Sequence, residues 1–353
     1  MRKGGGLKMV EIESIILDCL KQLKCERTIY SIYHLLNGKK SSQTIQDAHL
    51  FSMKRYFGIY ESLTRESFDE IIESLVDKKW IEYSDEQRYI LTHLGTFILE
   101  RASTLKYMNG WSYHLFTSKF WERLSLFVQV TSNLMYEEAH YLPIQKNKDV
   151  HIWLKTTLKE INVPRKELGN IVFSELFQCF QDAAGIDPSL VVFRLTGFRR
   201  IGLTPLQTAK KLNMDIHDYQ VGFIHTLHYL LHTVSRNPKR YSILALLMKD
   251  FEQSNELTIS ARKTLNLLEQ GFSLDQIANV RHLKESTIED HLIEFALHIE
   301  NFSIDSYVNQ EMQKKIVDIT RNAGTRQLKL IRDKYKDATY FQIRLVMAKY
   351  GDR

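Results

Sequence analysis

Three histidines have a spacing that could support metal chemistry. His225, His228 and His232 recur at intervals of three and four residues, so in a helix they would share one face, a spacing that zinc sites use. No Asp, Glu or Cys lies among them to complete a ligand set, and His217 lies nearly two turns earlier. We therefore expect no metal and no cofactor, and we interpret the histidines as partly buried neighbours of the apolar residues on the same helix.

The other side chains with functional potential are cations, which contact phosphate groups. Eight of them lie close together near the C-terminus: Lys314, Lys315, Arg321, Arg326, Lys329, Arg332, Lys334 and Lys336. Six more lie in two shorter groups: Arg199, Arg200, Lys210 and Lys211 in the middle of the chain, and Lys39 and Lys40 in a basic turn. We predict that these residues bind DNA phosphates. A solvated surface with some intramolecular ion pairs is the alternative.

No catalytic motif accompanies these cations. The chain has only 15 glycines and no Gly-rich phosphate loop, and neither a Ser-His-Asp order nor a paired-carboxylate motif stands out. Scattered residues can still meet in space. We therefore predict a protein that is not an enzyme.

The composition indicates a folded protein dominated by helices. The chain has 353 residues, of which 44% are hydrophobic and 25% charged, enough for two or three domains with cores. With only 15 Gly and 5 Pro, and with helical periodicity through most of the chain, we expect a mainly α fold. No apolar run approaches a membrane span, and the three cysteines show no C-x-x-C spacing. The expected location is the cytoplasm, in association with the nucleoid and without a membrane partner.

Charge is distributed unevenly along the chain. The net charge is +6, yet residues 251–310 carry 4 basic and 10 acidic side chains. Residues 311–353 carry 11 basic and 5 acidic side chains. An acidic module is thus followed by a basic one, which bears on partners rather than on fold.

The first predicted module, residues 9–103, has the element order of a winged helix. A helical pattern ends at Gly38, and another helix is expected after Thr64, which can cap its N-terminus. Two alternating stretches separated only by residues 85–87 predict a short β-hairpin, and a further helix follows it.

Residues 34–95 resemble the winged-helix domain that follows the helicase core in RecQ-type DNA helicases. The matching residues are Leu36, Gly38, Lys39, Ser41, Tyr56, Phe57, Gly58, Leu91, Thr92, Leu94 and Gly95. Some relatives carry an aromatic strand-separating residue on the hairpin, whereas residues 85–87 are Asp, Glu and Gln here. The four-cysteine zinc element and the helicase motor are missing. The resemblance therefore implies a helicase-type domain without a motor.

The middle module, residues 104–250, is predicted to be helical and to contain a helix-turn-helix pattern. Thr204 is followed by Pro205 and Gln207, a combination typical of a helix start. A turn near Asn213 leads to a second helix, which carries the three histidines.

The third module, residues 256–353, contains another helix-turn-helix pattern. Ser273 and Gln276 predict a capping box, and a turn at His282 and Leu283 precedes a helix that begins with acidic residues. This region resembles the helix-turn-helix domain appended to the C-terminus of many RecQ-type helicases. The matching residues are Thr264, Leu265, Gly271, Ile277, Ala278, Arg281, Thr287, Ile288, His291 and Leu292.

The acidic helix has two faces. The face expected in the core holds Ile288, Leu292, Phe295, Ala296 and Ile299. The opposite face holds Asp290, Ile293, Glu294 and Leu297, and its carboxylates would be repelled by DNA phosphates. We predict that these four residues are exposed and bind a protein partner. Contact with the rest of the same domain is the alternative.

With helicase-type appendages at both ends and no motor between them, the whole chain resembles the YpbB-type family, which is typically encoded beside a RecQ-type helicase in Gram-positive bacteria. The resemblance implies an accessory protein that binds a RecQ-type DNA helicase, and further repair or replication proteins, and touches DNA without sequence specificity. A helix-turn-helix transcription regulator is the alternative, and it would need base-reading side chains that the acidic helix lacks.

Overall fold

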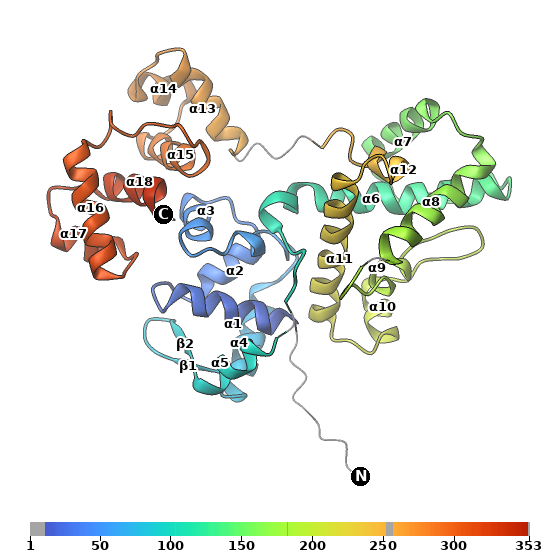
Figure 1. Ribbon diagram of the computed structural model, residues 1–353, viewed down its shortest axis with the longest axis horizontal. Coiled ribbons are helices and arrows are strands. Elements are labelled where there is room, and N and C mark those ends of the chain that lie inside the picture. The colour runs from blue at the N-terminus through green and yellow to red at the C-terminus, as the bar shows by residue number, and fades with distance from the viewer. Residues whose placement is uncertain (1–10, 103, 182, 252–256, 352–353) are drawn as a thin grey trace, which may run out of the picture. The chain divides into compact units, whose positions relative to one another are not determined.

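The computed structural model describes residues 11–102, 104–181, 183–251 and 257–351. These residues form eighteen α-helices and one two-stranded antiparallel hairpin, which confirms the predicted mainly α fold (Figure 1). None of the described helices combines the length and the apolar character that a bilayer span requires.

Contacts divide the chain into two compact units. Among the described residues, the first unit joins 11–15 to the residues between 101 and 251, and the second joins 16–100 to 257–351. The sequence predicted three consecutive modules, residues 9–103, 104–250 and 256–353. The grouping of the two ends of the chain into one unit was not predicted, because sequence patterns describe local elements and not the contacts between distant ones.

The N-terminal part of the second unit has the predicted order of helices and hairpin. Its elements are α1 (Glu11–Leu23), which begins in the first unit, then α2 (Tyr30–Leu36), α3 (Ser42–Leu50), a 3₁₀ turn (Lys54–Tyr56), α4 (Arg65–Asp77), β1 (Ile81–Tyr83), β2 (Tyr89–Leu91) and α5 (His93–Glu100). The Thr64 side chain accepts a hydrogen bond from the backbone N–H of Ser67, so the predicted cap is confirmed. In the hairpin, Tyr83 pairs with Tyr89 and their rings make an edge contact.

Two glycines of the helicase-like motif are required by close backbone approaches. Gly38 has a φ of +68°, and a Cβ there would lie 2.9 Å from the Cα of Gly58. A Cβ on Gly95 would lie 1.9 Å from the carbonyl oxygen of Trp80, the residue directly before β1. These glycines therefore allow the close packing of the N-terminal helices and the hairpin.

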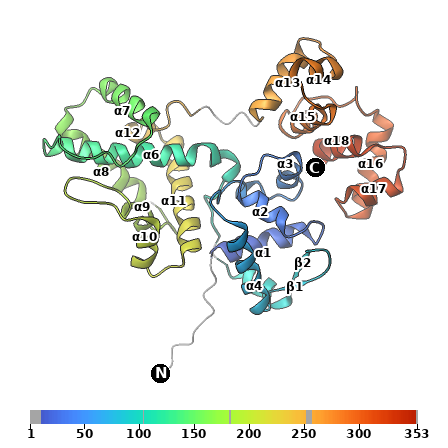
Figure 2. The same ribbon diagram turned by 180° about the vertical axis from the view of Figure 1, so that it is seen from behind.

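The C-terminal part of the second unit contains α13 (Ile259–Glu269), α14 (Leu274–Arg281), α15 (Glu285–His298), α16 (Gln310–Ala323), α17 (Leu328–Lys334) and α18 (Tyr340–Tyr350). Helix α15 is central, because it packs against α13, α14, α18 and also α3. Figure 1 and Figure 2 both show α3 beside α18. The second unit therefore has a core built from the two ends of the chain.

The first unit is a helical assembly around two long helices. Its elements are α6 (Gly110–Met135), α7 (Lys148–Glu160), α8 (Arg165–Gln181), α9 (Ser189–Val192), α10 (Pro205–Lys211), α11 (Ile216–Arg236) and α12 (Ser242–Leu246). Helix α11 is apolar and buried around most of its circumference, and it packs on α6, α8, α9, α10 and α12. The capping box of Thr204 and Gln207 starts α10 as predicted, and Asn213 has a φ of 52° in the turn before α11.

Candidate nucleic-acid interface

The helix-turn-helix of the second unit is formed by α14 and α15. Ser273 and Gln276 make both hydrogen bonds of a capping box at the start of α14. The helix ends at His282, which has a φ of 52° in the left-handed region, and the chain then turns into α15. Both sequence predictions for this motif are confirmed.

Thr264 of α13, Arg281 of α14 and His291 of α15 form a polar network between these three helices. The Oγ1 of Thr264 lies 2.8 Å from the Nδ1 of His291, and both side chains are buried. Arg281 donates hydrogen bonds to Thr264 and to the backbone carbonyl of Ser260, the latter at 2.7 Å. Burial and the nearby charge of Arg281 lower the pKa of His291 to about 4, so the ring is neutral at pH 7. These residues join α13, α14 and α15 to one another.

The face of α15 that was predicted to be exposed is largely buried, so the predicted exposure is wrong, and the binding of a protein partner by these residues stays a prediction. Ile293 is only 1% exposed and Glu294 only 6%, and Leu297 is partly buried. Helices α3 and α18 cover this face. The sequence shows two apolar faces on one helix, but it does not show which distant element covers the second one.

The carboxylates of this face have partners within the second unit. Glu294 accepts hydrogen bonds from the backbone N–H of Thr258 and from its hydroxyl, the latter at 3.1 Å, at the start of α13. Asp290 forms an ion pair with Arg344 of α18 at 2.9 Å. The Nε of Arg344 donates to the Oε1 of Gln46 in α3 at 3.0 Å. Sequence reasoning missed Arg344, because no local pattern distinguishes it from other cations of the tail.

The accessible end of α15 is acidic. Its first turn exposes Glu285 and Ser286, and Glu289 is partly buried one turn later. The pKa of Glu289 is raised by burial and by the nearby charges of Glu285 and Asp290. Such a helix end is unsuited to the phosphate-lined edges of a DNA groove.

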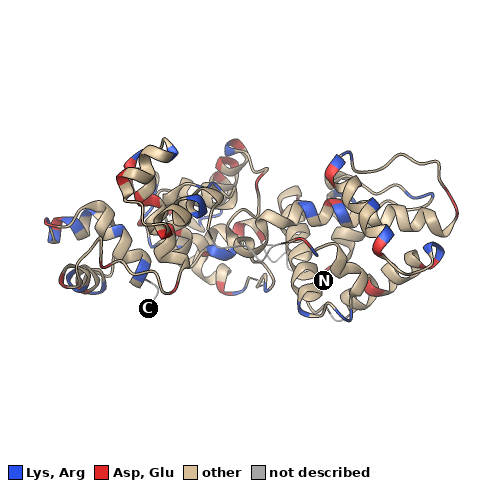
Figure 3. Ribbon diagram, turned by 90° about the horizontal axis from the view of Figure 1, so that it is seen from above, with Lys and Arg blue, Asp and Glu red and all other residues tan. Residues whose placement is uncertain are grey.

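Most of the predicted phosphate-binding cations of the tail are exposed on α16 and α17 or directly after them. The exposed residues are Lys314, Lys315, Arg321, Lys329, Arg332, Lys334 and Lys336. Lys315 pairs with Glu311 at 2.7 Å, and the guanidinium of Arg332 lies 4.4 Å from the ring centre of Tyr340. Figure 3 shows basic segments repeatedly along the helices near the C-terminus. The two helices and the residues directly after α17 therefore expose seven Lys and Arg side chains to solvent.

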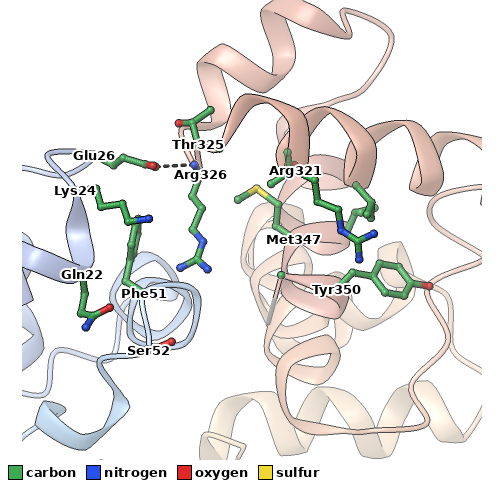
Figure 4. A pocket seen from close by; sticks show the side chains of 15 residues that line it. Gln22, Lys24, Glu26, Phe51, Ser52, Arg321, Thr325, Arg326, Met347 and Tyr350 are labelled. Atoms are coloured by element: carbon green, nitrogen blue, oxygen red, sulfur yellow. Dashed lines mark hydrogen bonds between the residues drawn. The ribbon is translucent and has the colours of Figure 1, made fainter. Parts of the chain in front are cut away.

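Arg326 differs from the other cations of the tail. Its backbone N–H donates to the Oε2 of Glu26 at 2.7 Å, and its guanidinium lies 5.3 Å from the ring centre of Phe51. It lines a pocket together with Arg321 and with Lys24, which sequence reasoning missed (Figure 4). The left-handed turn at Lys24 gives no signal that a sequence pattern could detect.

Lys39 and Lys40 lie exposed in the turn between α2 and α3. Ser41, the next residue, caps α3 by accepting a hydrogen bond from the backbone N–H of Thr44. The positive charge of Lys40 also acts on Glu294, where it opposes the rise in pKa that burial causes. The two lysines are therefore on a different element from the cations of α16 and α17.

The four cations predicted in the middle module belong to the first unit. Arg199 and Arg200 are exposed in a tight turn closed by the pairing of Gly197 with Arg200. Lys210 and Lys211 are exposed at the end of α10, where Lys211 lies 4.3 Å from the ring centre of Phe193.

Two histidines of α11 accept hydrogen bonds from backbone N–H groups. The Nε2 of His225 accepts from the N–H of Tyr107 at 3.1 Å, and the Nδ1 of His228 accepts from the N–H of Asn109 at 3.2 Å. His228 is also 3.1 Å from the hydroxyl of Thr117. Burial lowers the pKa of His228 to about 3. Within the described ranges, no group of three or more His, Cys, Asp or Glu could hold a metal ion.

An apolar groove of about 750 Å³ lies in the first unit among α6, α8 and α9. Phe173 and Phe177 line it with stacked rings and are 68% and 57% exposed, and Tyr136 lines it as well. Arg200 is the charged residue among the described side chains that line it. Exposed aromatic residues gathered in one groove are typical of a contact with another protein.

The comparisons with known proteins agree with this architecture. A helix-turn-helix domain family matches residues 260–347, the region that contains α14 and α15. The chain is 33% identical over 341 residues to Protein YpbB of Bacillus subtilis (strain 168), which covers 95% of this chain and 96% of that protein. No solved structure matches the chain. On the strength of this near full-length similarity, the chain belongs to the YpbB family and carries a helix-turn-helix domain in its C-terminal part.

Proposed function

We propose that the chain is a non-enzymatic accessory protein of a RecQ-type DNA helicase, acts in DNA repair or replication, and contacts DNA phosphates without reading sequence. One contrast supports the DNA part: α15 is enclosed by α3 and α18, whereas the cations of α16 and α17 are exposed. Exposed Lys and Arg side chains bind the phosphates of any sequence, and they release counterions when they do so.

The same contrast disfavours a transcription regulator. A regulator places base-reading donors and acceptors in the major groove, usually from the second helix of the motif. Here the open end of that helix offers Glu285 and Ser286, and its remaining faces are occupied by other helices.

A test of the DNA part uses unrelated duplexes of equal length. The full chain should bind them with equal affinity, and the affinity should fall steeply as salt rises, because counterion release drives the contact. Selection of one strong consensus site from random DNA would overturn the proposal.

The helicase part is supported by the two sequence resemblances, one at each end of the chain. We assign this contact to the apolar groove of the first unit, since the outer face of α15 is enclosed. The groove offers Phe173 and Phe177 to apolar side chains and Arg200 to a carboxylate. Its occupant would be a helicase segment that combines apolar side chains with an acidic group.

Purified helicase from the same cell tests this assignment. Phe173→Ser with Phe177→Ser should weaken the complex by about tenfold, because two exposed aromatic anchors are removed, and should leave DNA affinity unchanged. Leu142→Ser with Ile152→Ser is the matched control, since both residues are exposed in the same unit outside the groove. Normal helicase binding by the phenylalanine variant would exclude the groove. Absence of binding by the wild-type chain would overturn the accessory role itself.

A further inference from the structure

A pocket of about 310 Å³ lies within the second unit, where the turn after α1 and the end of α3 meet the turn between α16 and α17. Figure 4 shows Lys24 extending from one wall and Arg326 extending into the gap between Phe51 and Met347. Arg321 lines the pocket as well, beside Tyr350. Lys24 and Arg326, from two distant parts of the sequence, therefore point into the same gap, and Arg321 lines the pocket on the other side of Met347.

Two arginines, Arg27 and Arg326, lie beside the ring of Phe51, and they differ in their ion pairs. Arg27 lies 5.1 Å from the centre of the Phe51 ring and is neutralised by Asp47, which it contacts at 3.0 Å. Arg326 lies 5.3 Å from the centre of the same ring. Among the described residues, no carboxylate lies at ion-pairing distance from the guanidinium of Arg326. Arg27 is therefore a structural pair, whereas the guanidinium of Arg326 makes no such pair and interacts with Glu26 through its charge alone.

The pocket has one acidic side chain, Glu26. Its carboxylate is occupied by the backbone N–H of Arg326 at 2.7 Å, and burial is the main cause of its raised pKa. With Glu26 ionised, the cations Lys24, Arg321 and Arg326 leave an excess of two positive charges. A phosphomonoester carries about −1.5 to −2 at pH 7, whereas a phosphodiester within a strand carries a single negative charge.

The size and the other walls of the pocket define the rest of the ligand. Val317, Val346, Met347 and Tyr350 provide an apolar wall beside the cations. A volume of about 310 Å³ lies at the lower end of the range for small-molecule sites, roughly 300 to 1,000 Å³. It exceeds what a bare phosphate needs, so there is room for an attached group.

We propose that this pocket binds a phosphomonoester with a nucleoside attached, as found at the phosphorylated end of a nucleic-acid strand and in a free nucleoside monophosphate. Lys24 and Arg326 contact the phosphate oxygens, Arg321 completes the charge, and the nucleoside lies against the apolar wall. The inference deepens the proposed function for the strand-end ligand and is independent of it for the free nucleotide.

Two single-stranded oligonucleotides that differ only at the 5′ end, one with a phosphate and one with a hydroxyl, test the proposal with the full chain. The wild-type chain should prefer the phosphorylated strand by about tenfold, the effect of one or more charge-assisted hydrogen bonds. Lys24→Gln with Arg326→Gln should abolish the preference. Lys155→Gln with Lys263→Gln, which removes two exposed cations outside the pocket, should retain it.

Direct binding of adenosine monophosphate, measured by titration calorimetry with inorganic phosphate as the reference, distinguishes the two sources. Binding of the nucleotide that is lost in Lys24→Gln with Arg326→Gln, without any strand-end preference, identifies the free nucleotide as the ligand and supports the pocket. Equal binding of the two strands together with no binding of the nucleotide overturns the proposal, while the DNA contact of the proposed function stands. Nucleotide binding by a chain that binds no DNA supports the pocket and overturns the DNA contact.

Discussion

Two helix-turn-helix pairs, α10–α11 in the first unit and α14–α15 in the second, are built with the same devices. Each begins with a complete capping box. Each buries a histidine of its second helix against a threonine, His228 with Thr117 and His291 with Thr264. In both pairs the second helix supplies core contacts, although in a DNA reader it would face a groove.

The pairs differ in what encloses the second helix. Helix α11 is covered by α6, α8, α9, α10 and α12, which all come from one continuous stretch of the chain. Helix α15 is covered on its second face by α3, from the other end of the sequence. A helix-turn-helix pattern therefore predicts the geometry of two helices and leaves the exposure of the second one to elements elsewhere.

The largest expected effect tests whether α15 is enclosed. Ile293→Ala should cost about 2 to 5 kcal/mol of unfolding free energy, because it creates a cavity at a fully buried position, and Leu227→Ala in α11 should cost a similar amount. Ile259→Ala, at a position that is 80% exposed, should stay within about 0.5 kcal/mol. Urea unfolding measures the free energy of unfolding of all three variants. An unchanged value for Ile293→Ala would show that this face of α15 is exposed.

The buried histidines should make both units sensitive to acid. Burial lowers the pKa of His228 to about 3 and of His291 to about 4, below the usual value near 6.5. The unfolded chain then binds protons that the native chain does not, so stability decreases as pH falls below about 6.5. For His291 this decrease reaches on the order of 3 kcal/mol near pH 4.

Unfolding measured between pH 7 and pH 4 checks this prediction. His291→Asn keeps an acceptor or donor near Thr264 but cannot titrate, so its stability should depend less on pH than that of the wild-type chain. An unchanged slope would mean that His291 is not buried in the neutral form.

A smaller loss of stability is expected from a substitution that affects the cover of α15 and not that of α11. Arg344→Met removes the ion pair with Asp290 and the hydrogen bond to Gln46, and should cost about 1 to 3 kcal/mol, because partly buried polar groups lose their partner. It should also increase hydrogen exchange in α3 and leave exchange in α11 unchanged. Lys263→Met, at an exposed position, is the control. Equal protection of α3 in both variants would contradict the role of Arg344.

The smallest effects concern the exposed cations. Lys329→Gln with Lys334→Gln on α17 should reduce the salt dependence of DNA binding by about 0.9 in log–log slope for each phosphate that the variant no longer neutralises. Lys210→Gln with Lys211→Gln, at the end of α10, tests the equivalent cations of the first unit. If only the Lys210→Gln with Lys211→Gln variant changes the slope, DNA binds to the first unit and not to the C-terminal helices.

Local chemistry made much of this fold predictable. The caps at Thr64, Thr204 and Ser273 and the hairpin around residues 85–87 follow from hydrogen bonds or turns within a few residues, and they form as predicted. The apolar core face of α15 was also predictable from its period, with Ile299 less buried than the others.

Long-range contacts account for what the sequence did not predict. Arg344 and Gln46 are separated by 298 positions, and Arg326 and Glu26 by 300. The enclosure of Ile293 and the pocket beside Lys24 both depend on such contacts. A single sequence carries no signal for them, because the residues involved are ordinary ones in ordinary helices.

The division of the second unit between the two ends of the chain has a consequence during synthesis. Residues 16–100 leave the ribosome first, and the partner helices α15 and α18 follow only after the 153 residues Arg101–Gln253. At translation speeds of about 5 to 20 residues per second, the 248 positions from Leu50 to His298 take roughly 12 to 50 s, and α3 is not covered by α15 during that time. During that interval the nascent chain exposes an apolar surface, and the first unit has time to fold before the second is complete.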